Sequence, residues 1–466
     1  MDLKKYTFVL LFFVFQLNII GQKEDRIWYF GGDCTNAAAG GAGLDFNSGN
    51  PIALINSAMP QTEGSATQSN RNGSILFYTD GVDVFDKTHS IMLNGSGLGG
   101  HVSSEQSSLI IPFVNDSTKF YIFAQDGMPT ANGTGLHYSI VDITLNGNLG
   151  AITATKAVLL QPGTSEILTA TKHANGMDYW VITTDFDSLI FNTYKVTQFG
   201  ISPPIKTNLG FNSVSWANIR FNNKGNKITF CSQYTGNLVR YIADFNLTSG
   251  IVSNQIPIDT GAVTDGAEFS PNDSLFYSQS FLGLGNFVLH QYKIFSPNIY
   301  ASRQLIQSST YFADFCDFKL APNGKIYVSK ECADSIDVIN FPNVIGTSCG
   351  FQRNILWLAN RKQYAFFPNE IFSIAKLPLS VNKISISKDD VKIYPNPNNG
   401  LFTLKIDEEI KNAEIILFNS LGQRVYEQTV IQGLNTINTN NLAKGLYNYI
   451  LLQDKQKVDA GKLSVE

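Results

Sequence analysis

The sequence has few charged side chains. Only 15% of its 466 residues are Asp, Glu, Lys or Arg, against ~25% in an average soluble domain. The formal net charge is −4 and no basic run occurs, so nothing in the composition indicates a nucleic-acid or anionic-membrane partner. Hydrophobic residues still make up 43%, which separates this chain from disordered sequences. Gly, Asn, Ser and Thr take the place of charged residues and favour turn-rich β structure.

Cysteine is also scarce, and no two cysteines have the C-x-x-C spacing of common zinc and thioredoxin-like sites. The five are Cys34, Cys231, Cys316, Cys332 and Cys349. Five cysteines cannot all pair within one chain. Cys332 and Cys349 lie closest in sequence and are a candidate disulfide, and the alternative is that most of the five are buried free thiols.

Long apolar segments are absent except at the start of the chain. Lys4 and Lys5 precede an apolar stretch over residues 6–20, which Gly21 and Gln22 follow. As a helix this stretch spans only about 22 Å, short of the ~30 Å hydrocarbon core of a bilayer. We therefore predict a secretory signal peptide over residues 1–21, cleaved between Gly21 and Gln22, and no transmembrane segment.

Long helical periodicity is missing from residues 22 to 380, and a repeat stands in its place. A polar turn followed by a short aromatic-rich apolar run recurs at intervals of 43 to 60 residues. The turns are Asn72-Gly73, Asn115-Asp116, Asn175-Gly176, Lys224-Gly225, Asn272-Asp273 and Asn323-Gly324. Asn-Gly favours tight hairpins, and a unit of strand, hairpin, strand and strand is one propeller blade. A repeat of this length indicates a radial or solenoid array.

The all-β fold predicted for residues 22–377 is a β-propeller. Its length favours seven blades, with six or eight as alternatives. The segment from Ile27 to Phe46 has the pattern of middle strands in a blade that lacks its first strand. We expect that strand to come from the far end, near residues 366–374, because closure by both termini leaves a ring of sheets without a loose edge.

A polar linker over residues 378–390 leads to a last domain over residues 391–466. About seven short strands punctuated by Pro and Gly predict a small Ig-like β-sandwich there. Pro395 and Pro397 cannot lie in a central strand and indicate an edge or a connecting loop. The motif residues of this domain are Tyr394, Pro395, Asn396, Pro397, Gly400, Gly422, Gly445, Tyr447, Gly461 and Lys462.

These motifs, in this order, resemble the type A sorting domain of the type IX secretion system. The resemblance covers the Tyr-Pro-Asn-Pro opening, the Leu-Gly-Gln hairpin at 421–423, the Gly-Leu-Tyr strand at 445–447 and the terminal Gly-Lys strand. It implies Sec export, recognition by an outer-membrane translocon and removal of the domain by a sortase-like peptidase. The product would be secreted or attached to the outer-membrane surface, often on lipopolysaccharide.

The first part of the propeller region also resembles a known group. Residues 28–31, 43–46, 63–67, 76–81 and 92–95 are similar to the propeller-like N-terminal regions of large surface proteins of gliding Bacteroidetes. This resemblance brings no catalytic residues with it.

Candidate metal ligands are few. Asp80, Asp83 and Asp86 recur at three-residue spacing around an Asp-Gly hairpin. An oxygen-rich cluster of this kind can bind calcium, whereas Asp-Gly is above all a turn signal, and both interpretations stay open. No other cofactor is expected. Gly95 to Gly100 fits a dinucleotide-binding motif and Gly346 to Gly350 fits a nucleophile elbow, but neither has the helix context that its chemistry needs.

Five carboxylates near strand ends could face one side of the propeller and act on a glycan. They are Glu63, Asp126, Asp185, Asp265 and Asp314. Hydrogen bonding within loops is the competing interpretation of these residues. The sequence contains no compact catalytic motif, so it favours a binding or adhesion module for a glycan or a protein. A polysaccharide hydrolase or lyase, and a scaffold in the gliding or secretion machinery, are the alternatives.

Overall fold

The computed structural model describes residues 23–32, 40–60, 62–127, 135–212, 218–234, 237–259, 262–283, 285–311, 314–372, 391–407, 413–419, 424–453 and 456–466. The chain divides into two compact units, Met1–Leu377 and Pro378–Glu466. The predicted signal peptide, its cleavage site at Gly21 and Gln22, and the linker over 378–390 lie outside the described residues. In the part of the chain that the structure describes, no helix is long and apolar enough to cross a bilayer.

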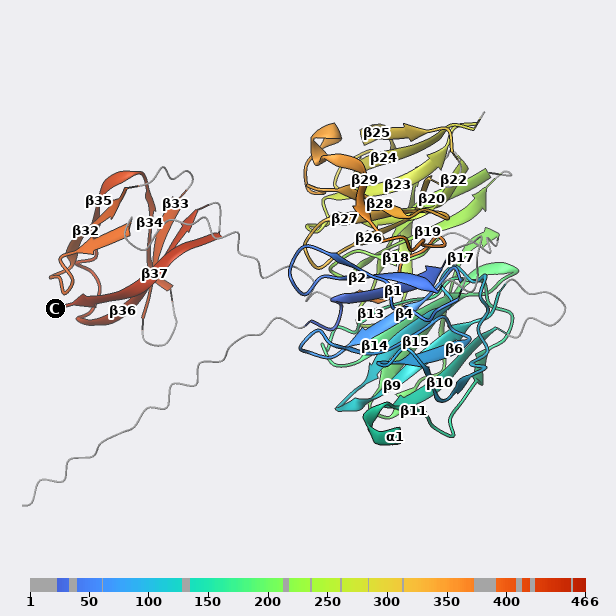
Figure 1. The fold of residues 1–466 in the computed structure, drawn as a ribbon. Helices are drawn as coiled ribbons and strands as arrows, with labels where there is room; N and C mark the ends of the chain where they lie inside the picture. The colour runs from blue at the N-terminus through green and yellow to red at the C-terminus, as the bar shows by residue number, and fades with distance from the viewer. Residues whose placement is uncertain are drawn as a thin grey trace, which may run out of the picture. The chain divides into compact units, whose positions relative to one another are not determined.

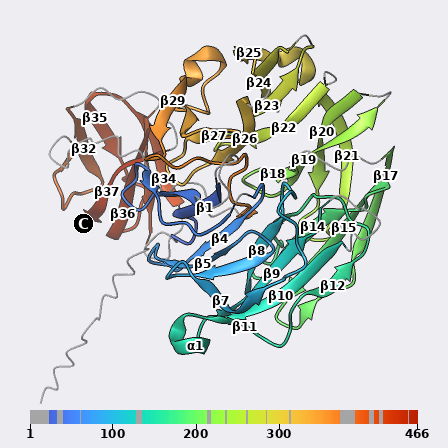
Figure 2. The same cartoon turned by 45° about the vertical axis from the view of Figure 1, so that its right-hand side comes forward.

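The described residues of the first unit form seven blades of antiparallel strands (Figures 1 and 2). The first three blades are β1 (Ile27–Gly32), β2 (Gly41–Asp45) and β3 (Ile52–Leu54); β4 (Ala66–Ser69), β5 (Ile75–Thr79), β6 (Asp83–Asp86) and β7 (Ile91–Ser96); and β8 (Ser108–Phe113), β9 (Asp116–Gln125), β10 (Leu136–Asp142) and β12 (Val158–Gln161). The short elements α1 (Leu145–Asn148) and β11 (Ala151–Ile152) lie between β10 and β12, and β11 pairs with both β10 and β7.

The other four blades all have four main strands. They are β13 (Thr169–Lys172), β14 (Tyr179–Thr184), β15 (Ser188–Thr197) and β17 (Ile205–Asn212); β18 (Arg220–Phe221), β19 (Lys227–Tyr234), β20 (Asn237–Phe245) and β21 (Val252–Asp259); β22 (Ala262–Phe269), β23 (Leu275–Phe281), β24 (Phe287–Lys293) and β25 (Gln304–Ser309); and β26 (Asp314–Leu320), β27 (Ile326–Lys330), β28 (Ser335–Ile339) and β29 (Phe351–Trp357). The minor elements are β16 (Gly200–Ile201), η2 (Tyr300–Ser302), η3 (Gly346–Cys349) and β30 (Ile371–Phe372).

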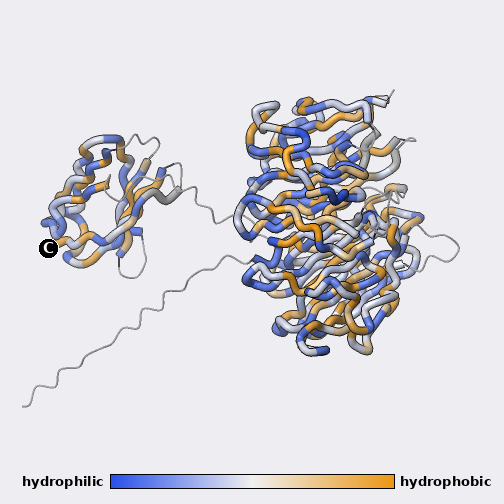
Figure 3. Tube along the Cα trace, viewed as in Figure 1, coloured by the Kyte–Doolittle hydropathy of each residue, from blue (hydrophilic) through white to orange (hydrophobic). Residues whose placement is uncertain are grey.

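Separate hydrophobic clusters hold the ring together. Each pair of neighbouring blades, including the seventh and the first, shares its own cluster of buried side chains. Figure 3 accordingly shows hydrophobic segments spread through the propeller and not gathered in one mass. Trp28 of the first blade lies 6.1 Å from Tyr327 of the last, ring centre to ring centre, at the junction that closes the ring. The predicted all-β propeller with seven blades is confirmed.

The two faces of the propeller differ in the connections that they carry. The six predicted polar turns join the first and second strands of blades 2 to 7, and we call the side on which they lie the turn face. The connections between second and third strands, such as 80–82, 185–187 and 331–334, lie at the opposite ends of the strands. That side, which we call the loop face, also holds the starts of the innermost strands.

Residues 363–372, which we call the axial strap, follow the last blade and pass through the centre of the ring. The strap closes the ring differently from the expected strand addition. Within the described residues, the strap's backbone hydrogen bond to β1 joins the Tyr364 N–H to the oxygen of Gly31 at 3.1 Å. Beyond that point Pro368 has no N–H to donate to a ladder, and Phe367 donates to a side chain. The open edge of β1 is covered instead by Thr67, whose hydroxyl accepts the Tyr29 N–H at 3.0 Å.

The second unit is a two-sheet β-sandwich. One sheet holds β31 (Val391–Tyr394), β32 (Leu401–Ile406) and β35 (Gly433–Asn438), and the other holds β34 (Arg424–Val430), β33 (Ala413–Phe418), β36 (Gly445–Gln453) and β37 (Gln456–Val465). Inward-facing residues such as Phe402, Leu404, Ile415 and Leu463 form one buried core between the sheets. Outward positions along β32 and β35 alternate with them, as expected for sheets buried on one face.

The cysteines correct one expectation. Cys231, Cys316 and Cys349 are not part of a disulfide, while Cys332 is disulfide-bonded. The suggested Cys332–Cys349 disulfide is therefore wrong. Cys349 belongs to the buried cluster between blades 6 and 7, so closeness in sequence did not bring it to Cys332.

Candidate functional site

The centre of the propeller is lined by charged residues that occupy equivalent positions in successive blades. Arg220, Glu268 and Lys319 each lie five residues before the second residue of their blade's polar turn. They belong to β18, β22 and β26, the innermost strands of blades 5, 6 and 7. All three are at least 98% buried. Charges this deep require partners, because desolvation of an isolated charge is very costly.

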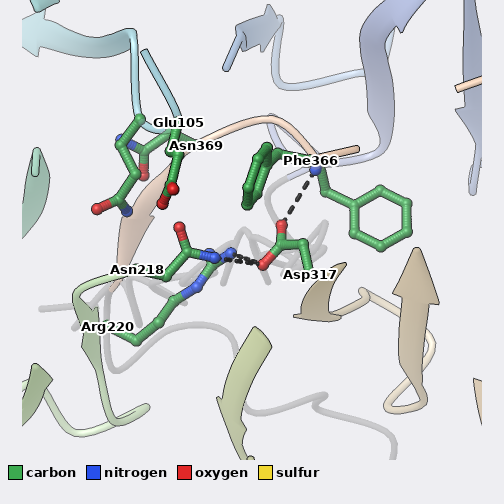
Figure 4. A pocket seen from close by; sticks show the side chains of 8 residues that line it. Glu105, Asn218, Arg220, Asp317, Phe366 and Asn369 are labelled. Carbon is green, nitrogen blue, oxygen red and sulfur yellow. Dashed lines mark hydrogen bonds and ion pairs between the residues drawn. The ribbon is translucent and has the colours of Figure 1, made fainter. Parts of the chain in front are cut away.

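Asp317 is the main partner of Arg220. Its carboxylate lies 2.6 Å from a guanidinium nitrogen of Arg220, and the side chains are 1% and 3% exposed. The Asn218 amide donates to the same carboxylate oxygen at 2.8 Å, and the Phe318 N–H donates to it at 2.9 Å. Figure 4 shows Arg220 and Asn218 both pointing toward Asp317. The pair thus joins the inner strands of blades 5 and 7 through charge-assisted hydrogen bonds.

The axial strap is held by the same cluster. The second oxygen of Asp317 accepts the Phe367 N–H at 3.0 Å. The Lys319 ammonium donates to the oxygen of Pro368 at 2.7 Å and lies 3.0 Å from the Glu370 carboxylate. It also lies 5.0 Å from the centre of the Trp28 ring, within the range of a cation–π contact. Blade 7 therefore fixes the middle of the strap.

Burial and neighbouring charges shift the pKa values of Arg220 and Glu268 in this cluster. Burial alone would lower the pKa of Arg220, but the carboxylates of Asp317, Glu268 and Glu370 outweigh it and raise that pKa. Burial raises the pKa of Glu268 to about 7, against the opposing effects of Arg220 and of the Leu320 N–H. The Glu268 carboxylate accepts that N–H at 3.1 Å and so ties blade 6 to blade 7. Such a carboxyl can exchange a proton near neutral pH.

The space beside the Arg220–Asp317 pair is narrow. Its lining comes from inner strands and from the strap, and the gap leaves no room for a water-sized molecule. The lining residues are Glu105, Gln106, Asn218, Arg220, Asp317, Phe366, Phe367 and Asn369. The Gln106 amide bridges two blades, because it donates to the oxygen of Ile219 at 3.1 Å. In this arrangement the cluster joins blades and presents no surface to a substrate.

Three of the five predicted surface carboxylates lie at loop-face ends of their strands and hold neighbouring residues in place. Asp126 accepts the Gly127 N–H at 2.8 Å, and Asp185 accepts the Asn192 amide at 2.7 Å. Asp314 accepts the Ser309 hydroxyl at 2.5 Å and forms an ion pair with Arg353 at 2.8 Å. Glu63 is half-buried beside the start of β4, and the side chain of Asp265 lies outside the described residues.

Two of the three candidate calcium ligands, Asp80 and Asp86, accept hydrogen bonds of the kind that turn residues make. Asp80 accepts the N–H groups of Val82 and Asp83 at 2.8 and 2.7 Å. Asp86 accepts the N–H and the hydroxyl of Thr88 at 2.7 and 2.6 Å. Burial raises the pKa of Asp80 to about 6, which weakens its case as an anionic ligand. Among the described residues, no group of three or more side chains of metal-binding type comes together, and this spacing is explained by Asx turns.

In the second unit the Pro-Asn-Pro-Asn segment covers the edge of the last strand. Asn396 donates its side-chain amide to the oxygen of Lys462 at 2.8 Å and accepts the Ser464 N–H at 2.9 Å. Asn398 continues the contact, because its backbone N–H donates to the oxygen of Ser464 at 2.9 Å. Tyr394 ends β31 and is 45% exposed. The motif thus satisfies the polar groups of an edge that would otherwise be open.

The motif glycines and the tyrosine shape the rest of the sandwich. A Cβ on Gly461 would lie 2.7 Å from the ring of Tyr449, and Gly400 has a φ of +96° beside Asn440. Gly445 begins β36, which pairs with β37 along its length. The Tyr447 hydroxyl donates to the oxygen of Ala443 at 2.5 Å and fixes the start of that strand. Gly422 lies outside the described residues.

Sequence reasoning missed the axial cluster, although a signal was present. Asp317 and Lys319 alternate with Phe318 and Leu320 in β26, the first strand of its blade. Charged residues at the inward positions of a buried strand indicate partners across an axis. The partners on the strap are distant in sequence, so spacing alone could not reveal them.

Comparison with known proteins locates the chain among solved structures and one family. A search of curated protein sequences finds no match. A 6-phosphogluconolactonase candidate from Bacteroides uniformis is 14% identical, with 68% of this chain and 92% of that chain covered and a TM-score of 0.44. The periplasmic gluconolactonase of Pseudomonas aeruginosa is 8% identical, with 94% and 100% covered and a TM-score of 0.38. TolB from Acinetobacter baumannii is 11% identical, with 76% and 68% covered and a TM-score of 0.37. At these scores the likenesses carry no argument about function.

The family comparison concerns the second unit. Residues 392–466 match the model of the secretion system C-terminal sorting domain. The match begins one residue into β31 and ends with the chain, so it covers the whole sandwich. The last domain of the chain is thus a type IX secretion sorting domain, which indicates export followed by secretion or attachment to the cell surface.

Proposed function

We propose that this protein is an exported binding module of a Bacteroidetes cell, whose propeller recognises a glycan or a protein outside the cell. The predicted signal peptide directs Sec export, and the sorting domain engages the type IX translocon. A sortase-like peptidase then removes the sorting domain. The propeller is the part that carries the final activity.

The observation that supports binding over catalysis is the filled axis. The strongest cluster of buried carboxylates and cations in the described part of the propeller is packed against the axial strap, with no room for a ligand group. A binding surface needs no such access, because side chains on either face suffice. On the loop face, Asp126, Asp185 and Asp314 accept hydrogen bonds from nearby residues.

The test uses the chain from residue 23 to residue 377, which contains the whole propeller unit. It is applied to arrays of bacterial, plant and animal glycans and of extracellular-matrix proteins. The same preparations are incubated with soluble polysaccharides, and reducing ends are measured. Retention of one ligand class without new reducing ends supports the proposal. Release of product at a rate proportional to protein concentration contradicts it.

A hydrolase or lyase is the second candidate, and the state of Glu268 is the observation that favours it. A carboxyl with a pKa of about 7 is suited to general acid or base chemistry. Its use would require the strap to leave the axis. If polysaccharide cleavage is found, Glu268→Gln should abolish it while Asp244→Asn, at an exposed ion pair of blade 5, should leave it unchanged.

A further inference from the structure

The axial strap has a direction. It begins beside the loop face, where the Gln363 N–H donates to the oxygen of Ala333 at 3.0 Å and the Cys332 N–H donates to the oxygen of Tyr364 at 2.9 Å. Both Cys332 and Ala333 belong to the connection between β27 and β28. The strap therefore enters the ring from the side that carries the second-to-third strand connections.

From the loop-face end of β4 the strap advances toward the opposite face. Asn369 pairs in parallel with Ala66, the first residue of β4, and its N–H donates to the oxygen of Ser65 at 2.7 Å. Ile371 and Phe372 of β30 then pair in parallel with Ala170 and Thr171 of β13. Because β13 runs from the loop face to the polar turn at 173–178, a parallel partner runs the same way. The chain thus threads the ring from the loop face toward the turn face.

From this direction we infer that the propeller is displayed on the cell with its turn face toward the surface and its loop face outward. The inference rests on the proposed surface attachment. The sorting domain lies on the C-terminal side of the strap, so any attachment through that end acts on a chain that has passed through the axis. The bonds to Asp317, Lys319 and Leu168 hold the strap in place under such a tether. The ligand is then met by the loop face.

Two exposed residues of similar size offer a matched pair of probes. Met177 lies in the polar turn of blade 4 on the turn face and is 58% exposed. Leu282 lies in the connection after β23 on the loop face and is 52% exposed. Substitutions at such exposed positions usually change stability by less than ~0.5 kcal/mol. Cys231 and Cys349 are buried but Cys316 is half-buried, so labelling of the unchanged full-length chain is measured and subtracted as background.

The experiment expresses Met177→Cys and Leu282→Cys in the full chain, in cells that carry a type IX secretion system. Whole cells are treated with a membrane-impermeant maleimide on a large polyethylene glycol. The labelled fraction of each variant is divided by the fraction labelled after the protein has been released from the cells. This ratio removes differences in intrinsic thiol reactivity, and thermal unfolding of the released variants checks that both are folded.

The orientation predicts a ratio near one for Leu282→Cys and a severalfold loss for Met177→Cys. Equal labelling ratios for the two variants, or a lower ratio for Leu282→Cys alone, would overturn the proposed orientation without contradicting surface attachment. If all of the protein is recovered from the medium, surface attachment itself is refuted and the orientation with it. The binding function is tested separately on the glycan and protein arrays, so a negative result for the orientation can be distinguished from a negative result for binding.

Discussion

Replacement of Asp317 by Asn should be among the most damaging single changes in the propeller. The side chain accepts bonds from Arg220, Asn218, Phe318 and the strap residue Phe367. An amide of the same shape keeps one acceptor oxygen, turns the other acceptor into a donor and removes the negative charge. The guanidinium of Arg220 would then remain in the centre of the ring without the carboxylate that compensates it most directly.

The expected cost follows from the burial of the pair, whose side chains are 3% and 1% exposed. Breaking such a buried pair by removing one partner costs about 3–5 kcal/mol, because the other charge stays desolvated. The exposed pair between Lys227 and Asp244 is the matched control, with side chains 31% and 44% exposed. Asp244→Asn should cost only ~0–1 kcal/mol.

The assay is chemical denaturation of the chain from residue 23 to residue 377, followed by tryptophan fluorescence and circular dichroism. Arg220→Met alone and the double variant Asp317→Asn with Arg220→Met complete a double-mutant cycle. Because the double variant leaves no unpaired guanidinium, it should be more stable than the sum of the single changes predicts. A loss below ~1 kcal/mol for Asp317→Asn, or strict additivity in the cycle, would refute the assigned role of the pair.

Three further outcomes are expected. Burial raises the pKa of Glu268 from 4.5 to about 7, so the folded chain binds more protons than the unfolded chain between these pH values. The free energy of unfolding should therefore fall as the pH rises through this range. Glu268→Gln should reduce this pH dependence in denaturation curves, and an unchanged pH dependence would contradict the raised pKa. Gly461→Ala places a methyl group against the ring of Tyr449 and should lower the stability of the sorting domain by about 1–3 kcal/mol. The expected results are a lower Tm and retention of the chain in the periplasm. Normal export with an unchanged Tm would be evidence against close packing of Gly461 on Tyr449. Cys231 and Cys349 should react with a thiol reagent only after unfolding, and rapid labelling of the native chain would show that they are accessible.

Much of the propeller could be predicted because its signals are local. Each polar turn lies within a few residues of the aromatic strand that follows it, as at Asn323-Gly324 before Ile326, and such pairs repeat at the length of a blade. The sorting domain was also accessible, since Asn396 and Tyr447 belong to short motifs of fixed order. In both cases the residues that decide the structure are neighbours in sequence.

The axial cluster could not be predicted with the same means. The partners Arg220 and Asp317 are 97 residues apart, and Asn369 reaches Leu168 across 201 residues. The expected closing strand shows the same limit. Phe366 and Phe367 have a strand-like composition, but Asp317 accepts the Phe367 N–H and Lys319 donates to the oxygen of Pro368, so these backbone groups bond within the axis. Tertiary contacts overrode local propensity there.

The axial strap is proposed to hold the ring of blades closed, and removal of the strap tests this role most directly. The free energy of unfolding is compared for two chains that start at residue 23 and end at residue 377 or at residue 362. The longer chain should unfold in one cooperative transition for the propeller, whereas the shorter chain, which lacks every strap contact, should lose that transition. Equal free energies of unfolding for the two chains would show that the ring closes without the strap.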